Sequence, residues 1–85
     1  MYDIKFTHTS LKQLGKLEKD VQERIISVLE RIRIRPERFV KKLIGDPGYR
    51  LRVGDYRILM DINDNELIIL VLNVGHRKNI YKSKR

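Results

Sequence analysis

Three arginines in one short stretch, GYRLRVGDYRI, have side chains whose chemistry suits phosphate groups. The stretch alternates polar and apolar residues, as a half-exposed β-hairpin does, and Gly54 with Asp55 suits a two-residue turn. Such a turn places Arg52 opposite Arg57, and the two-residue repeat of a strand puts Arg50 on the same face. Because guanidinium groups bind phosphate oxygens through planar pairs of hydrogen bonds, this cluster predicts a phosphate-binding face of a sheet.

The close approach of these arginines has an energetic cost that a purely structural role does not explain. Like charges directly opposite each other lie about 5 Å apart at Cβ, and they repel by roughly 1 to 3 kcal/mol, nearer the lower value when exposed. The alternative is that arginine keeps an exposed strand face soluble or protects a sheet edge from aggregation. Any single arginine fits that alternative, whereas several on one patch favour phosphate binding.

Two helices are predicted to precede the hairpin and to cover the other face of its sheet. A short helix, capped by a residue such as Thr7, follows the first strand. A longer helix is expected from Val21 to Arg33, opened by a capping box of Asp20 and Glu23 and ended before Pro36. The apolar positions of the two helices are Leu11, Leu14, Leu17, Val21, Ile25, Val28, Leu29 and Ile32.

The predicted strands cover residues 2–6, 49–53, 56–62 and 66–74. Residues 36–48 are expected to form an irregular connection with Phe39, Leu43 and Ile44 tucked beneath it. The last strand, LIILVLNV, is apolar on both faces, which is typical of a central strand. The predicted fold is therefore an α+β domain over residues 1–85, in the order βααβββ, with a twisted, mainly antiparallel four-stranded sheet and two helices on one face.

Length and composition set the outer limits on function. The 85 residues suffice for one small domain, and 19 lysines and arginines against 11 acidic residues give a net charge of +8. Such a charge fits a polyanionic partner and equally fits a basic protein that is merely well solvated. The absence of cysteine excludes disulfides and thiolate chemistry. The lack of cysteine also fits the cytoplasm, which is the expected location. No apolar run approaches the roughly 18 residues of a membrane span, so we expect no membrane partner.

After the last strand, the ending GHRKNIYKSKR brings further candidates toward the hairpin tip. Pairing of the last two strands places Arg77, and with it His76, at the same end of the sheet as the arginine cluster. Histidine is the side chain that exchanges protons near neutral pH, although a lone histidine is more often structural. The sequence offers no carboxylate pair or metal-ligand cluster beside this patch, and we expect neither a metal nor a cofactor.

Two blocks, KLIGDPGYRLRVGDYRILMDI and VLNVGHRKNIY, resemble the RelE toxin group of the RelE/ParE superfamily. The resemblance covers nearly the whole chain, including the strand–helix–helix start. It implies a microbial-RNase-like fold and a ribosome-dependent endoribonuclease that cuts mRNA in the ribosomal A site by 2′-hydroxyl attack. It also implies that a cognate RelB-like antitoxin holds the protein inactive, and that the ribosome and mRNA are its other partners.

The resemblance assigns roles residue by residue. The implied catalytic residues are Arg50, Arg52, Arg57, Arg77 and Tyr81, with His76 as a further candidate. In well-studied relatives the first pair is lysine, whereas arginine stays protonated and serves poorly as a general base. Tyr81 would stack on a flipped base or shuttle a proton, or else simply pack on the sheet. The residues expected to bind RNA are Arg50, Arg52, Lys78, Lys82, Lys84 and Arg85.

Two other functions share some of these features. A relative in the same superfamily poisons DNA gyrase and cuts no nucleic acid, but the arginine set together with Tyr81 argues for the nuclease. A non-catalytic nucleic-acid-binding module has less support, because the predicted sheet lacks a paired-aromatic RNA motif and the chain lacks a helix-turn-helix signal.

Overall fold

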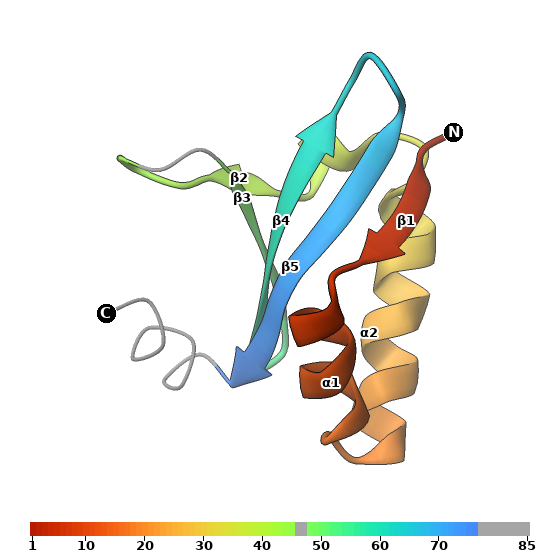
Figure 1. The fold of residues 1–85 in the computed structure, drawn as a ribbon, viewed down its shortest axis with the longest axis vertical. Coiled ribbons are helices and arrows are strands. Elements are labelled where there is room, and N and C mark those ends of the chain that lie inside the picture. Colours follow the sequence, from red (N-terminus) through yellow and green to blue (C-terminus); the bar gives the residue numbers. More distant parts are fainter. Residues whose placement is uncertain (46–47, 77–85) are drawn as a thin grey trace.

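A single mixed sheet organises the computed structural model, which describes residues 1–45 and 48–76. Its strands are β1 (Asp3–Phe6), β2 (Lys41–Lys42), β3 (Tyr49–Val53), β4 (Tyr56–Asn63) and β5 (Ile68–His76). Their order is β1-β5-β4-β3-β2, with β1 parallel to β5 and every other neighbouring pair antiparallel. The predicted α+β class and the mainly antiparallel sheet are confirmed. The sheet has five strands rather than four because the two residues of β2 pair with β3 (Figure 1).

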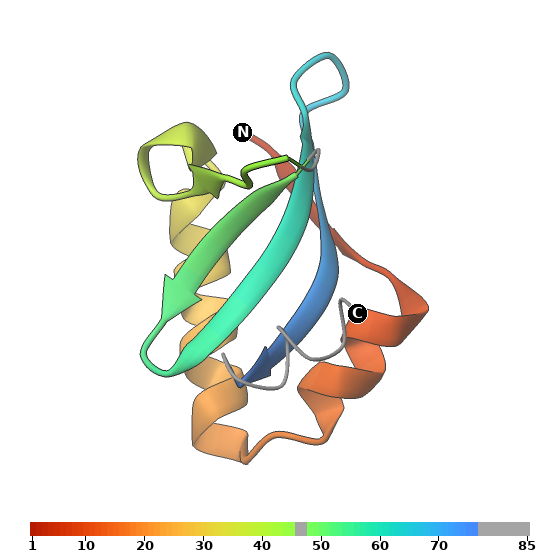
Figure 2. The ribbon, with the colours of Figure 1, turned by 90° about the vertical axis from the view of Figure 1, so that its left-hand side faces the viewer.

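Two helices, α1 (His8–Gly15) and α2 (Lys19–Ile32), lie on one face of the sheet, as predicted (Figures 1 and 2). Thr7 caps α1 by accepting a hydrogen bond from the Ser10 amide. The predicted capping box of α2 does not form, because the helix starts earlier and its N-cap is Glu18, whose side chain makes no capping bond. Asp20 instead lies in the first turn, where its charge complements the positive end of the helix. No helix in the described part of the chain is long and apolar enough to cross a membrane.

The hydrophobic core lies between the helices and the sheet. Its most buried members are Leu14, Ile25, Leu29, Ile32, Leu51, Val53, Ile58, Met60, Ile69, Val71 and Val74. Leu11, one of the predicted apolar positions of the first helix, does not join the core, since its side chain is 56% exposed. Ser10, the preceding residue, is fully buried against β5. Because successive residues of a helix point about 100° apart, Leu11 is turned away from the sheet when Ser10 faces it. The tight contact of α1 with the sheet is therefore polar as well as apolar.

Helix α1 continues the edge of the sheet where β1 ends at Phe6. The Ser10 hydroxyl donates a hydrogen bond to the carbonyl of Val71 (2.8 Å), and the side-chain Oε1 of Gln13 accepts one from the backbone amide of Val74 (2.7 Å). Ser10 and Gln13 are three residues apart, so they share one side of the helix. Gln13 thus satisfies a backbone amide of β5 beyond the end of β1, and Ser10 adds a second donor to the Val71 carbonyl, which also accepts the Thr7 amide at 3.1 Å. Helix α1 thereby covers the edge of β5 where β1 ends.

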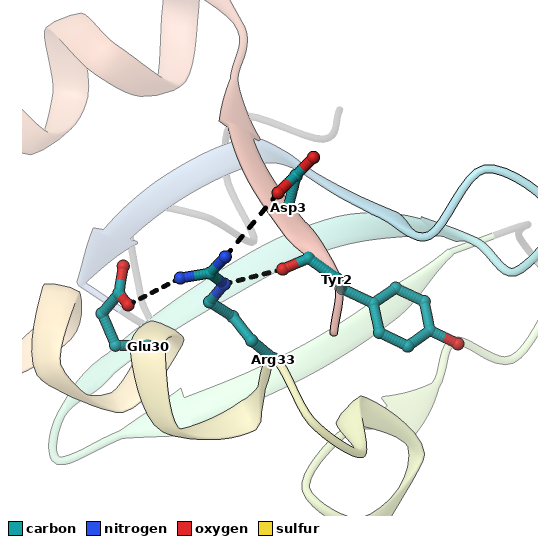
Figure 3. A network of polar contacts seen from close by, with 4 residues as sticks. All are labelled: Tyr2, Asp3, Glu30 and Arg33. Atoms are coloured by element: carbon teal, nitrogen blue, oxygen red, sulfur yellow. Dashed lines mark hydrogen bonds and ion pairs between the residues drawn. The ribbon is translucent and has the colours of Figure 1, made fainter.

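Arg33, just after α2, joins the helix end to β1 (Figure 3). Its Nε donates a 2.6 Å hydrogen bond to the carbonyl of Tyr2, whose amide in turn donates to the Arg33 carbonyl at 2.9 Å. The same guanidinium pairs with Glu30 at 2.9 Å and with Asp3 at 3.6 Å. One side chain therefore fixes the first strand against the end of the long helix.

The connection after α2 is more ordered than the sequence predicts. A short 3-10 helix, η1 (Pro36–Arg38), precedes β2, and its Pro36 is fully buried. The expectation that Phe39 and Ile44 tuck beneath this connection is wrong, since they are 47% and 99% exposed. Pro36 fills the space beneath, and its carbonyl accepts bonds from the amides of both Phe39 and Val40, which turns the chain outward.

Candidate functional site

The β3–β4 hairpin presents the arginine cluster on the face of the sheet opposite the helices. Gly54 has a φ of +58°, as the first central position of a primed turn requires, and the hairpin pairs Arg52 with Arg57. Arg50 lies two residues before Arg52, so all three share one face, which we call the open face. The neighbouring residues of alternate parity, Leu51, Val53 and Ile58, are buried in the core. The predicted register of the hairpin is confirmed.

A fourth cation joins this cluster from β2. Lys41 pairs directly with Arg50, so the open face carries two opposed pairs of positive charges, Lys41 with Arg50 and Arg52 with Arg57. These four side chains and Phe39 line a hollow of about 170 Å³, which we call the basic hollow. Neither Lys41 nor Phe39 was among the predicted site residues. The two consecutive lysines, Lys41 and Lys42, indicate a basic segment, but a strand of only two residues has no periodic pattern that would place Lys41 beside Arg50.

Three of the four cations of the basic hollow take part in no ion pair within the described residues. The ion pairs recorded among residues 1–45 and 48–76 all involve Arg33, and Lys41, Arg50 and Arg52 take part in none. Arg52 is exposed and its Nε donates to the Gly54 carbonyl at 3.3 Å, whereas Arg50 and Arg57 are half-buried. The basic hollow is therefore a concentrated positive field that an anion can neutralise.

His76 reaches the predicted end of the sheet but lies on its other face. It pairs with Tyr56, while the preceding Gly75 pairs with Arg57. Its ring meets the Tyr56 ring edge-on, with the centroids 5.7 Å apart, on the side where Tyr56 packs against the core. The structure therefore separates His76 from the basic hollow.

Six of the predicted site residues belong to the last nine residues of the sequence. Arg77, Lys78, Tyr81, Lys82, Lys84 and Arg85 lie outside the described residues. Among the residues that are described, no group of three or more histidine or carboxylate side chains is arranged to hold a metal ion. The chemistry that the described part of the site supports is therefore the neutralisation of negative charge by lysine and arginine.

A larger hollow, of about 750 Å³, lies at the far end of the open face, around the β4–β5 turn. Its charged lining is mainly acidic, with Asp61, Asp64 and Glu66 against Lys5, and Ile68 and Leu70 contribute apolar surface. We call it the acidic hollow. Despite its size it is the wrong place for phosphate, because carboxylates repel that group. The open face is thus basic at the hairpin tip and acidic at the opposite end.

Fold and site together define a small α+β protein whose sheet carries a basic hollow on the face opposite its helices. The family model described as the ParE toxin of the type II toxin–antitoxin system parDE matches residues 4–81. The chain therefore belongs to this family, within the RelE/ParE superfamily, and it is a RelE-type toxin of a type II toxin–antitoxin system.

Individual relatives agree with this assignment. The chain is 31% identical over 80 residues to a RelE-like toxin protein of Escherichia coli, covering 91% of this chain and 84% of that protein. It is 29% identical to the mRNA interferase toxin RelE of Escherichia coli K12, with the same coverage of both chains. The fold matches the toxin–antitoxin complex RelBE2 of Mycobacterium tuberculosis with a TM-score of 0.83 and 28% identity, covering 89% of this chain and 98% of that one.

Proposed function

We propose that this toxin is a ribosome-dependent endoribonuclease that cuts mRNA in the A site and so stops translation. The observation that carries the proposal is the basic hollow, where Lys41 with Arg50 and Arg52 with Arg57 form two directly opposed pairs of like charge. A relative named an mRNA interferase, 29% identical over 80 residues, supports the same activity.

The proposed reaction is attack of a ribose 2′-hydroxyl on the adjacent phosphate. The 2′-hydroxyl loses its proton as its oxygen bonds to phosphorus, and negative charge accumulates on the phosphoryl oxygens. The bond from phosphorus to the 5′-oxygen then breaks and that oxygen takes up a proton, which leaves a 2′,3′-cyclic phosphate and a 5′-hydroxyl. Arg50, Arg52 and Arg57 bind these oxygens, and a well-aimed donor of this kind contributes about 3 to 4 kcal/mol to the stability of a transition state. Arg77 and Tyr81 complete the proposed site. Arg77 would bind the scissile phosphate, and Tyr81 would stack on a base or transfer a proton.

The proton transfers of this reaction have no obvious agent in the described part of the site. Every polar side chain that lines the basic hollow is lysine or arginine, and His76 lies on the opposite face. Arginine stays protonated and is a poor general base. We infer that the ribosome supplies the missing catalytic power by holding the 2′-hydroxyl in line with the phosphate, since orientation alone lowers such barriers by several kcal/mol.

The proposed inhibitor is a cognate RelB-like antitoxin. A solved complex of the related RelBE2 proteins supports this partner. An antitoxin with an acidic or amphipathic segment would neutralise the basic hollow and make the toxin too bulky for the A site. The basic tail residues Lys78, Lys82, Lys84 and Arg85 are then free to bind RNA once the antitoxin is removed.

The alternative is a gyrase poison, which the description of the matching family model favours. Primer extension on a translated message, performed after inducing the toxin in cells, separates the two functions. Cuts that follow the reading frame of the message and vanish when its start codon is removed support the ribonuclease. Double-strand DNA breaks without such cuts would establish the gyrase poison instead.

A further inference from the structure

Phe39 is the one apolar side chain among the described residues that line the basic hollow. The other lining residues are Lys41, Arg50, Arg52 and Arg57. Phe39 is 47% exposed in a chain that has only two phenylalanines and no tryptophan. A half-exposed ring forgoes much of the hydrophobic stabilisation that burial would supply. Its position therefore suggests a contact with a ligand.

The backbone holds Phe39 firmly on both sides. On one side, the fully buried Pro36 anchors η1, and the Phe39 amide donates a 3.0 Å hydrogen bond to the Pro36 carbonyl. On the other side, Lys41 is fixed by its strand pairing with Arg50. The ring is thus carried on an anchored turn beside the cations, and little conformational entropy is lost when it meets a ligand.

An aromatic ring beside a group of cations is the combination with which proteins bind single-stranded nucleic acid. Cations bind the phosphates, and a ring stacks on the base of the same or the next nucleotide. Only a ribose separates a base from its phosphate. A phosphate bound by Arg50 and Arg52 therefore has a base within reach of the wall that Phe39 forms.

We propose that Phe39 is a base-stacking residue for the RNA substrate, binding the base next to the phosphate that the basic hollow holds. This inference rests on the proposed ribonuclease function and adds a positioning and specificity role to it. Stacking accepts every base but grows with ring area, so it favours purines at the stacked position.

The test uses ribosomes programmed with a short message that carries the fluorescent base 2-aminopurine at one A-site position at a time. A 2′-O-methyl group at the cut position blocks cleavage in the binding measurements. The variants are Phe39→Leu, which keeps an apolar side chain without a ring, and Phe39→Trp, which keeps a ring. Leu11→Ala, at an exposed apolar residue on α1, is the control for the loss of exposed apolar surface.

We expect wild-type toxin and Phe39→Trp to change the fluorescence of 2-aminopurine at one codon position. Phe39→Leu should lose that change and cut the unmodified message at least about 10-fold more slowly, with a weaker purine preference, as the loss of one base stack predicts. Leu11→Ala should behave like wild type in both measurements.

Two outcomes would overturn the inference. Equal cutting and an equal fluorescence change by Phe39→Leu and wild type would show that the ring stacks on no base. Normal cutting by Phe39→Leu together with weaker antitoxin binding would assign Phe39 to the protein partner instead. If wild-type toxin cuts no message on the ribosome, the proposed function itself fails, which these measurements distinguish from a failure confined to Phe39.

Discussion

Arg52 and Arg57 occupy directly opposed positions across the β3–β4 hairpin, so two positively charged side chains extend from neighbouring strands on the same face of the sheet. Opposed like charges destabilise a sheet, and Lys41 opposite Arg50 repeats the arrangement one strand further out. The hairpin thus contains a charge repulsion that replacing either arginine would relieve. Such a cost in stability is explained if the arginines serve to bind an anion rather than to stabilise the fold.

The first prediction concerns this repulsion. Arg52→Gln should leave stability unchanged or raise it by about 0.2 to 1 kcal/mol, because it removes one exposed charge from an opposed pair. Urea unfolding measures the change, and high salt should shrink it because salt screens exposed charges. Lys12→Gln, at an exposed lysine on α1, is the control for the loss of one positive charge. A clear loss of stability in Arg52→Gln alone would mean that Arg52 has a structural role.

The second prediction concerns toxicity. Arg57→Ala and Arg77→Ala should each abolish growth arrest upon induction, because each removes a cation that the proposed reaction needs. Growth curves measure the effect, and far-UV circular dichroism of the purified variants checks that the fold is intact. A folded double variant that arrests growth as strongly as wild type would eliminate the proposed site.

A third prediction separates positioning from intrinsic chemistry. Purified toxin should cut naked RNA poorly and cut the same message rapidly in the A site of a ribosome, since the basic hollow supplies charge but no general base. Gel analysis of end-labelled RNA with and without ribosomes measures both rates. Efficient digestion of a random RNA in the absence of ribosomes would indicate a general nuclease.

The fourth prediction concerns the antitoxin. Association with an acidic antitoxin segment should be fast and should slow as salt rises, because the +8 charge of the toxin steers the encounter. Dissociation should depend much less on salt, since apolar burial governs it. Stopped-flow or surface-binding measurements across a salt series give both rates. An on-rate that ignores ionic strength would refute steering by the basic hollow, even for a tight complex.

The fifth prediction uses Tyr2. Its hydroxyl donates a 2.6 Å hydrogen bond to the Asp64 carboxylate, which raises the pKa of Tyr2 from 10.0 to about 12. The folded state therefore retains this proton where the unfolded chain releases it, so the stabilisation is complete below pH 10 and is lost as the pH rises toward about 12.

Tyr2→Phe should accordingly be less stable than wild type below pH 10, and the difference should vanish near pH 12. Urea unfolding at several pH values measures the difference, and ultraviolet titration of tyrosine should show the loss of one group that ionises near pH 12. A stability difference that stays constant across this range would exclude the bond to Asp64 as its cause.

The hairpin was predictable in register because local chemistry determines it. A turn at Gly54 and Asp55 permits one pairing, and the two-residue period of a strand then assigns each arginine to a face. The helices and their order also follow from local periodicity. The first residue of α2 was not predictable, because Glu18 and Asp20 are both acidic residues near the boundary and the sequence pattern does not distinguish which of them is the N-cap.

Features that depend on contacts distant in sequence were not predictable in the same way. The pairing of β4 with β5 contains a β-bulge: Leu59 pairs with Asn73, the next residue Met60 pairs with Val71, and Leu72 between them has no partner on β4. An extra residue of this kind shifts the alternation of a strand, so residues after it face the side opposite to the one that simple alternation predicts. The side of the sheet that His76 occupies depends on this irregularity.

Phe39 and Lys41 show a second limit. Their roles depend on a turn anchored by the buried Pro36 and on a two-residue strand, and neither leaves a periodic pattern in the sequence. An apolar residue in an irregular connection is ordinarily assigned to the core, as Phe39 was. Its exposure became visible only once the packing of Pro36 was known.

The two hollows at opposite ends of the open face have a consequence for motion in solution. Arg57 and Asp61 lie four residues apart on β4, so positive and negative ends share one surface and give it an electric dipole along the strand. In the field of a polyanion this dipole experiences a torque that turns the hairpin tip inward and the β4–β5 turn outward. If the basic hollow binds RNA as proposed, this torque orients the molecule before first contact and shortens the search over orientations that otherwise limits the rate of association.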